Sequence, residues 1–146
     1  MRPEIVVGRL VTAGLLGWMA WIHLHLWDGG YRHIHDIGPL FLANFVLAVL
    51  AGLVVVAAPA RLLPFAAVGA ALLAGGTLVG LAISINHGLF GFRDSTNAPF
   101  ADLSIWVEAL AVVAGVVLAI RSWVRRPPRS SSGRLSGPAR TATSAG

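Results

Sequence analysis

The chain has 146 residues, of which 56% are hydrophobic and 12% are charged, and its formal net charge is +5. Soluble globular domains carry about a quarter charged residues, so this composition indicates an integral membrane protein. The chain has no cysteine, which excludes thiolate catalysis, iron–sulfur clusters and cysteine-ligated zinc. It also lacks nucleophile, phosphate-loop and metalloprotease motifs. No motif therefore supports an enzymatic activity, which the sequence leaves open, and we expect no nucleic-acid partner.

Four apolar segments follow one another along the chain. Each is close to the roughly 20 residues that an α-helix needs to cross a hydrocarbon core of about 30 Å. The first has Arg2 before it and Arg9 near its start but lacks the small-residue cleavage site of a signal peptide, so we expect it to be retained. The segments cover residues 6–27, 39–58, 62–85 and 103–124. The predicted fold is all-α, a four-transmembrane-helix bundle formed by one domain, residues 1–126.

The distribution of arginine predicts the orientation in the membrane, because basic residues beside spans are retained on the cytoplasmic side. All 11 basic residues are arginine. If both termini are cytoplasmic, only Arg32 and Arg93 lie outside. The arginines placed inside are Arg2, Arg9, Arg61, Arg121, Arg125, Arg126, Arg129, Arg134 and Arg140. We expect a multi-pass protein of the cell membrane, with both termini cytoplasmic and anionic lipid headgroups beside these arginines.

The composition changes after the fourth span. Residues 127–146 are rich in Pro, Ser, Gly and Arg and have no apolar periodicity. Such a segment cannot bury enough apolar surface to offset the entropy of ordering. We predict a disordered basic cytoplasmic tail.

The two predicted outer loops share a pattern. In each, a helix ends near a histidine, the loop carries Gly–aromatic–Arg, and a proline opens the next helix, where its missing N–H costs nothing. The first copy contains His25, Gly30, Tyr31, Arg32, Pro39 and Asn44, and the second contains His87, Gly91, Phe92, Arg93, Pro99 and Ser104. We predict two duplicated helical hairpins, residues 5–58 and 62–124, related by a pseudo-two-fold axis along the membrane normal.

Small and polar residues form stripes on the predicted helices. Membrane helices associate through small residues that let their backbones approach, and residues three or four apart share one helical face. The stripes are Ala13 and Gly17; Asn44, Ala48 and Gly52; Gly76, Gly80 and Ser84; and Ser104, Glu108, Ala111 and Gly115. We expect these faces to pack against one another.

The stretch "HLHLWDGGYRHIHD", residues 23–36, concentrates histidine in an otherwise apolar chain. On a helix His23 and His25 would point about 200° apart, so they cannot both face one ion. The spacing matches no recognised metal motif, and we favour a hydrogen-bonding turn. The alternative is a small redox protein that binds a divalent metal or haem, with haem held between His25 and His87 across the pseudo-axis. Its candidate ligands are His25, His33, His35 and His87.

The same stretch resembles a group of small four-span membrane proteins of actinobacteria. Their loop pattern LWxxGYRxI, followed by IGPLFLxN, is matched here from Leu26 to Ile34 and from Ile37 to Asn44. The chain departs from the group at His35 and Asp36, where we expect proline and a small residue. The resemblance implies the four-span topology and implies no biochemical activity or cofactor.

Glu108 lies about five positions into the fourth predicted span. A carboxylate at that depth is costly unless it is protonated, paired or facing a cavity. We expect Arg32, Arg93 or His87 to fold back onto it from the loops, with Asn44 across the bundle and Tyr31 from the repeated loop in the same cluster. The cluster is either a polar clasp that fixes helix register or the base of an outward-facing ligand pocket.

Three functions remain open on the sequence. The first is a non-catalytic component of the cell envelope that assembles with membrane partners or with copies of itself, and this is the one the sequence favours. The second is the haem or metal protein described above. The third binds or carries a lipophilic or protonatable small molecule in a pocket over Glu108.

Overall fold

The computed structural model describes residues 2–95 and 99–124 of the chain. Four α-helices account for most of this part, and a 3-10 turn, η1, follows the first. The elements are α1 (Pro3–Asp28), η1 (Tyr31–His33), α2 (Ile37–Ala57), α3 (Leu63–Asn86) and α4 (Ala101–Val124). Each α-helix is long and apolar enough to cross a membrane. The prediction of an all-α, four-transmembrane-helix bundle is confirmed, with boundaries within three residues of the predicted ones.

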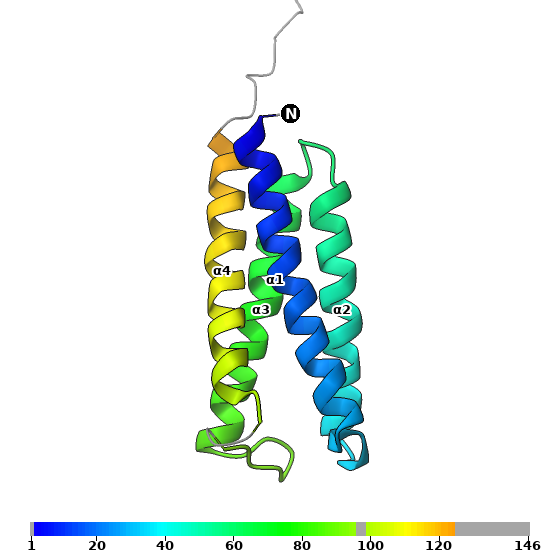
Figure 1. Ribbon diagram of the computed structural model, residues 1–146. Helices are drawn as coiled ribbons and strands as arrows, with labels where there is room; N and C mark the ends of the chain where they lie inside the picture. Colours follow the sequence, from blue (N-terminus) through cyan, green and yellow to red (C-terminus); the bar gives the residue numbers. More distant parts are fainter. Residues whose placement is uncertain (1, 96–98, 125–146) are drawn as a thin grey trace, which may run out of the picture.

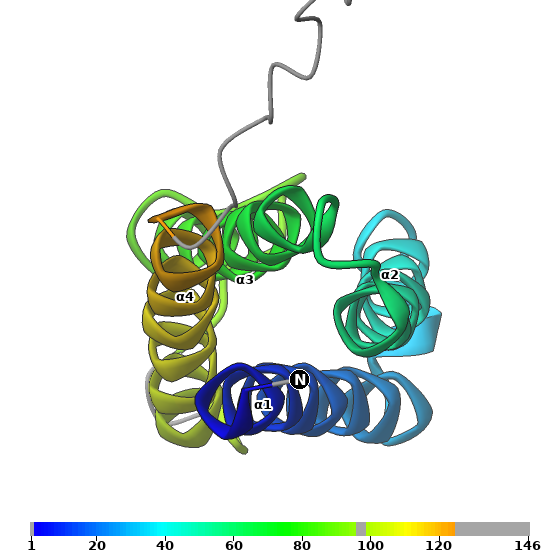
Figure 2. The same ribbon diagram turned by 90° about the horizontal axis from the view of Figure 1, so that it is seen from above.

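The helices run up and down in chain order around the bundle, so that α4 returns to α1 (Figures 1 and 2). The start of α1 and the end of α4 lie at one end of the bundle. The connections that follow α1 and α3 lie at the other end, which we call the loop end. Helix α1 is inclined, and runs from beside α4 at its start to beside α2 at its end (Figure 2).

Small residues set the spacing between neighbouring helices. The predicted stripe on α4 is confirmed, since Ser104, Glu108, Ala111 and Gly115 are all buried. A Cβ added at Gly115 would lie 3.0 Å from the Ala67 carbonyl oxygen of α3 and 3.2 Å from the Ala71 nitrogen. Helices α3 and α4 therefore approach backbone to backbone at this point.

Three glycines of the other stripes do not pack as predicted. A Cβ added at Gly17 of α1, or at Gly76 or Gly80 of α3, would have no neighbour within 4 Å. Gly17 and Gly76 are also exposed. Spacing alone does not tell which side of an evenly apolar helix faces its neighbours, because every side is compatible with lipid.

Arg9 is the most unusual buried residue of the bundle. We predicted it as one of the cytoplasmic-face arginines that set topology, yet only 6% of it is exposed. Its guanidinium donates from Nη1 to the carbonyls of Val55 and Val56, at 3.0 and 2.6 Å, and from Nη2 to that of Ala58, at 2.6 Å. The last carbonyls of a helix have no intrahelical donor, and a cation also suits the negative end of the helix dipole. Arg9 thus caps α2 and joins it to α1.

The connections at the loop end differ in local conformation. The first contains η1, whereas the second contains a tight turn closed by hydrogen bonds between Leu89 and Phe92. The duplication of two hairpins remains a prediction from the sequence pattern. The predicted disordered tail, residues 127–146, lies outside the described residues.

Candidate ligand-binding site

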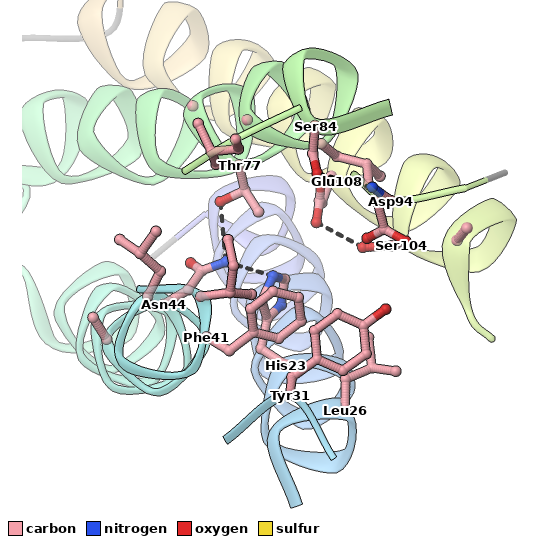
Figure 3. A pocket seen from close by; sticks show the side chains of 18 of the residues that line it. His23, Leu26, Tyr31, Phe41, Asn44, Thr77, Ser84, Asp94, Ser104 and Glu108 are labelled. Atoms are coloured by element: carbon pink, nitrogen blue, oxygen red, sulfur yellow. Dashed lines mark hydrogen bonds between the residues drawn. The ribbon is translucent and has the colours of Figure 1, made fainter. Parts of the chain in front are cut away.

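A pocket of about 420 Å³ lies between the helices toward the loop end. Its walls come from all four helices and from both connections, and most of them are apolar (Figure 3). Small-molecule sites typically have volumes of about 300–1,000 Å³, with a few polar groups on an apolar wall. The polar lining residues are His23, Tyr31, Asn44, Thr77, Ser84, Asp94, Ser104 and Glu108.

A chain of hydrogen bonds links three helices along one wall of the pocket (Figure 3). The Nδ1 atom of His23 lies 2.9 Å from the Met19 carbonyl oxygen, which can only accept, so Nδ1 carries the proton. The Nε2 atom then accepts from Asn44 Nδ2 at 2.8 Å, and the same amide nitrogen donates to Thr77 Oγ1 at 3.1 Å. Histidine is therefore neutral in this arrangement, and the Asn44 amide nitrogen is held between two acceptors, His23 Nε2 and Thr77 Oγ1.

The Asn44 carbonyl oxygen Oδ1 is left without a partner. It is buried and receives no hydrogen bond from the described residues. A buried acceptor with no donor costs roughly 1–3 kcal/mol relative to a satisfied one. The Asn44 carbonyl oxygen is therefore an unsatisfied hydrogen-bond acceptor in a residue of the pocket lining.

Glu108 supplies a second unpaired oxygen from α4. Its side chain is 1% exposed, and Oε1 accepts a hydrogen bond from the Ser104 hydroxyl at 2.7 Å (Figure 3). The other oxygen, Oε2, is buried with no partner among the described residues. A buried carboxylate is strongly disfavoured until a donor or a cation reaches it. The pocket therefore offers two unmatched oxygens, one from α2 and one from α4.

The two connections meet over the loop end of the pocket. The Tyr31 ring of η1 packs against Phe41 of α2 at 4.7 Å and against Phe92 of the second connection at 5.7 Å between ring centroids. The Asp94 side chain also lies close enough to the Tyr31 hydroxyl to interact with it. Tyr31, Phe92 and Asp94 all line the pocket, so together they cover its end, and we call these three residues the cap.

Titration of Tyr31 should report on the cap. Burial raises the pKa of its phenol above the ordinary 10.0, and the charge and hydrogen bond of Asp94 raise it further. The folded state holds the phenolic proton more tightly than the unfolded state does. The cap is thus fully stabilising below pH 10.0, and its contribution is lost as the pH rises through the raised pKa of Tyr31.

Tyr31 is the single tyrosine of the chain, so tyrosinate absorbance measures it alone. We expect its midpoint to lie above pH 10.0 and to fall toward that value in Asp94→Asn. Asp36→Asn, which removes an exposed acid of the first connection, is the matched control and should leave the midpoint in place. A midpoint that is the same in the wild type and in Asp94→Asn would contradict the Tyr31–Asp94 contact.

Three of the predicted cluster residues come together and two do not. Glu108, Asn44 and Tyr31 line the pocket, whereas Arg32 and Arg93 are absent from its lining. Arg32 is exposed and donates to Asp28 at 2.9 Å, and Arg93 donates to the Asn86 carbonyl at 2.7 Å. The predicted pairing of these arginines with Glu108 is therefore wrong. An arginine in a solvent-exposed connection can donate to acceptors at the end of the preceding helix while its charge stays hydrated.

The histidines of the metal or haem alternative lie elsewhere. His25 stacks on Trp21 and meets the edge of Phe100, and His87 is exposed where α3 ends. His33 and His35 are exposed in the first connection. Within residues 2–95 and 99–124, no group of three or more His, Asp or Glu side chains is placed to hold a metal ion.

Sequence reasoning missed His23 as a member of the site. His23 lies on the buried face of α1, four residues after Met19 and seven after Leu16. The signal was present, because polar Arg9 and Thr12 follow the same three- and four-residue spacing. A stripe that combines large apolar residues with buried polar ones identifies the interior face better than the positions of glycine.

Comparison with known proteins gives no match to a protein-family model, to a curated protein or to a solved structure.

Proposed function

We propose that this multipass membrane protein binds an amphipathic amine in the pocket, with Glu108 as the counter-charge. The observation that carries the proposal is the unpaired Glu108 Oε2, buried in an apolar pocket. An ammonium group supplies both things that this oxygen lacks, a hydrogen-bond donor and a positive charge. This is the third of the functions left open by the sequence, and the pocket now favours it over a role in envelope assembly.

The charges of the lining residues support a cationic ligand. Two carboxyl groups line the pocket, Asp94 and Glu108, and none of its lining residues is an arginine. The chain has no lysine. The one lining histidine, His23, uses both ring nitrogens in hydrogen bonds to the protein. Electrostatic complementarity therefore selects a positive group over a negative one.

The remaining groups suit the rest of such a molecule. The rings of Tyr31, Phe41 and Phe92 line the pocket, and ring faces attract cations. The apolar walls from α2 and α3 suit a hydrocarbon body. A volume of about 420 Å³ fits one short chain or ring system better than a complete two-chain lipid.

Binding of decylamine and of decanol to the protein in lipid nanodiscs tests the proposal. The two probes share a chain and differ in the charge of the head group. We expect decylamine to bind measurably and decanol to bind far more weakly. Removing one partner of a buried charge pair costs roughly 2–5 kcal/mol, and each 1.4 kcal/mol is tenfold in affinity. Glu108→Gln should therefore weaken decylamine binding by at least about tenfold.

The matched control removes another acid from the same helix. Asp102 of α4 is exposed and does not line the pocket, so Asp102→Asn changes the net charge by the same amount as Glu108→Gln. Calorimetric titration should give the wild-type affinity for this variant. Equal binding of decylamine and decanol, or full binding by Glu108→Gln, would rule out the proposed role of Glu108.

The placement in the cell is a further part of the proposal. The arginine distribution supports a cell-membrane protein with both termini cytoplasmic and with anionic headgroups beside that face. The pocket then lies in the outer half of the membrane. The loop motifs from Leu26 to Asn44 support membership of the four-span actinobacterial group.

A further inference from the structure

We infer that the ligand enters the pocket from the lipid bilayer, through an opening between α2 and α3, and not from water at the loop end. This inference rests on the proposed function and deepens it. It specifies that the ligand is a membrane-dissolved amine whose hydrocarbon body reaches the pocket sideways while its head group reaches Glu108.

The first observation is the exposure of the lining residues on one side. Leu40 and Leu47 of α2 and Leu72 of α3 line the pocket, although they are 45%, 51% and 70% exposed. On the opposite wall Ser104 and Glu108 of α4 are 7% and 1% exposed. The pocket wall therefore continues to the surface of the bundle between α2 and α3. In a membrane that surface faces hydrocarbon.

The second observation is the lack of side chains on α3 at the opening. Gly76 and Gly80 are one helical turn apart and both line the pocket. A Cβ added at either glycine would have no neighbour within 4 Å. In contrast to Gly115, these glycines do not mediate close helix packing. Because they have no side chains, they leave open space on the surface of α3 at the opening.

The third observation is the cover at the loop end. The contacts of Tyr31 with Phe41, Phe92 and Asp94 join the two connections over the pocket. A water-borne ligand would have to break this cap, whereas a membrane-dissolved one meets only the leucines of the opening.

Spin labelling tests the route, because the chain has no native cysteine. A nitroxide on Ser104→Cys reports from the wall opposite the opening. Collisions with oxygen, which concentrates in hydrocarbon, measure access from the bilayer, and collisions with a water-soluble nickel chelate measure access from water. Labels on Val113→Cys, an exposed residue of α4, and on His35→Cys, an exposed residue of the first connection, provide the lipid and water references.

We expect the Ser104→Cys label in vesicles to resemble the Val113→Cys reference, with severalfold more oxygen collisions than nickel collisions. Adding Gly76→Leu should block the opening and lower the oxygen collisions severalfold. Gly69→Leu, on the same helix with the same open space but outside the pocket lining, should have no effect. A label on Ala101→Cys, a buried pocket-lining residue of α4, repeats the measurement if Ser104→Cys fails to fold.

A label that resembles the His35→Cys reference would overturn lateral entry in favour of the aqueous route, and a label reached by neither reagent would overturn it in favour of a closed pocket. The test is made without ligand, so it is independent of the proposed function. Failure of decylamine to bind, with the expected oxygen access, would refute the amine ligand and leave the opening established. Normal decylamine binding with nickel access would refute the opening alone.

Discussion

Replacing Arg9 with methionine is expected to destabilise the bundle by about 3 kcal/mol. Hydrogen bonds to charged groups contribute roughly 1.5–3 kcal/mol each, and their contributions are not additive. Arg9 makes three such bonds to the end of α2, with the carbonyls of Val55, Val56 and Ala58. Methionine fills much of the space but leaves carbonyls without donors. This cost outweighs the gain from removing a buried charge, which is largest when both partners are replaced.

Reversible unfolding of the purified protein in mixed micelles, with increasing sodium dodecyl sulfate, measures this effect. Arg121→Met is the matched control, because Arg121 is an exposed arginine near the end of α4, at the same end of the bundle. It should change the free energy of unfolding by less than about 0.5 kcal/mol. Arg9→Lys should recover part of the loss, since an ammonium donates but lacks the planar fork of the guanidinium. Equal stability of Arg9→Met and Arg121→Met would show that the cap on α2 is dispensable.

Gly115→Leu is expected to have an effect of similar size through packing. Even a Cβ at this position would come within 3.0 Å of the Ala67 carbonyl oxygen and of the Ala71 Cβ. Backbone atoms cannot change rotamer to make room as a flexible side chain can, so the added side chain must push α3 and α4 apart. Overpacking a tight contact typically costs 1–3 kcal/mol, and the full leucine side chain places this variant at or above about 3 kcal/mol.

The same unfolding assay compares Gly115→Leu with Gly69→Leu. Both glycines lie in membrane-spanning helices, but Gly69 has open space where the side chain would be added. The control should stay within about 0.5 kcal/mol of the wild type. Gly115→Ala should be intermediate. Should Gly115→Leu be as stable as Gly69→Leu, the close approach of α3 and α4 would not exist in the folded protein.

The four-helix architecture could be predicted from composition because an apolar segment that crosses a membrane has to form a helix. Backbone groups in hydrocarbon must be satisfied within their own segment, so four apolar segments of about 20 residues become four helices. The stripe from Ser104 to Gly115 also identified the interior face of α4 correctly. The faces of α1 and α3 were harder to predict, because Gly17 and Gly76 fit the same spacing and yet are exposed.

The sequence pointed to the acidic residue of the candidate site, Glu108, but not to the residues that surround it. Glu108 was recognisable, since a carboxyl group inside a span always needs an explanation. Its predicted partners, Arg32 and Arg93, instead use acceptors at the ends of α1 and α3. Which acceptor a loop arginine reaches depends on the path of the connection, and sequence spacing does not determine that path. The site therefore lacks the counter-charge that the sequence led us to expect.

The distance along the chain between Arg9 and its acceptors constrains how the protein is made. The carbonyls that Arg9 caps lie 46 to 49 residues further along the chain. When α1 first reaches the membrane, its guanidinium therefore has no protein partner and must stay hydrated at the headgroup level. It can be buried only after α2 has been synthesised and inserted. We therefore expect the first two spans to be inserted together as a hairpin, with Arg9 buried only after Val55, Val56 and Ala58 have been synthesised.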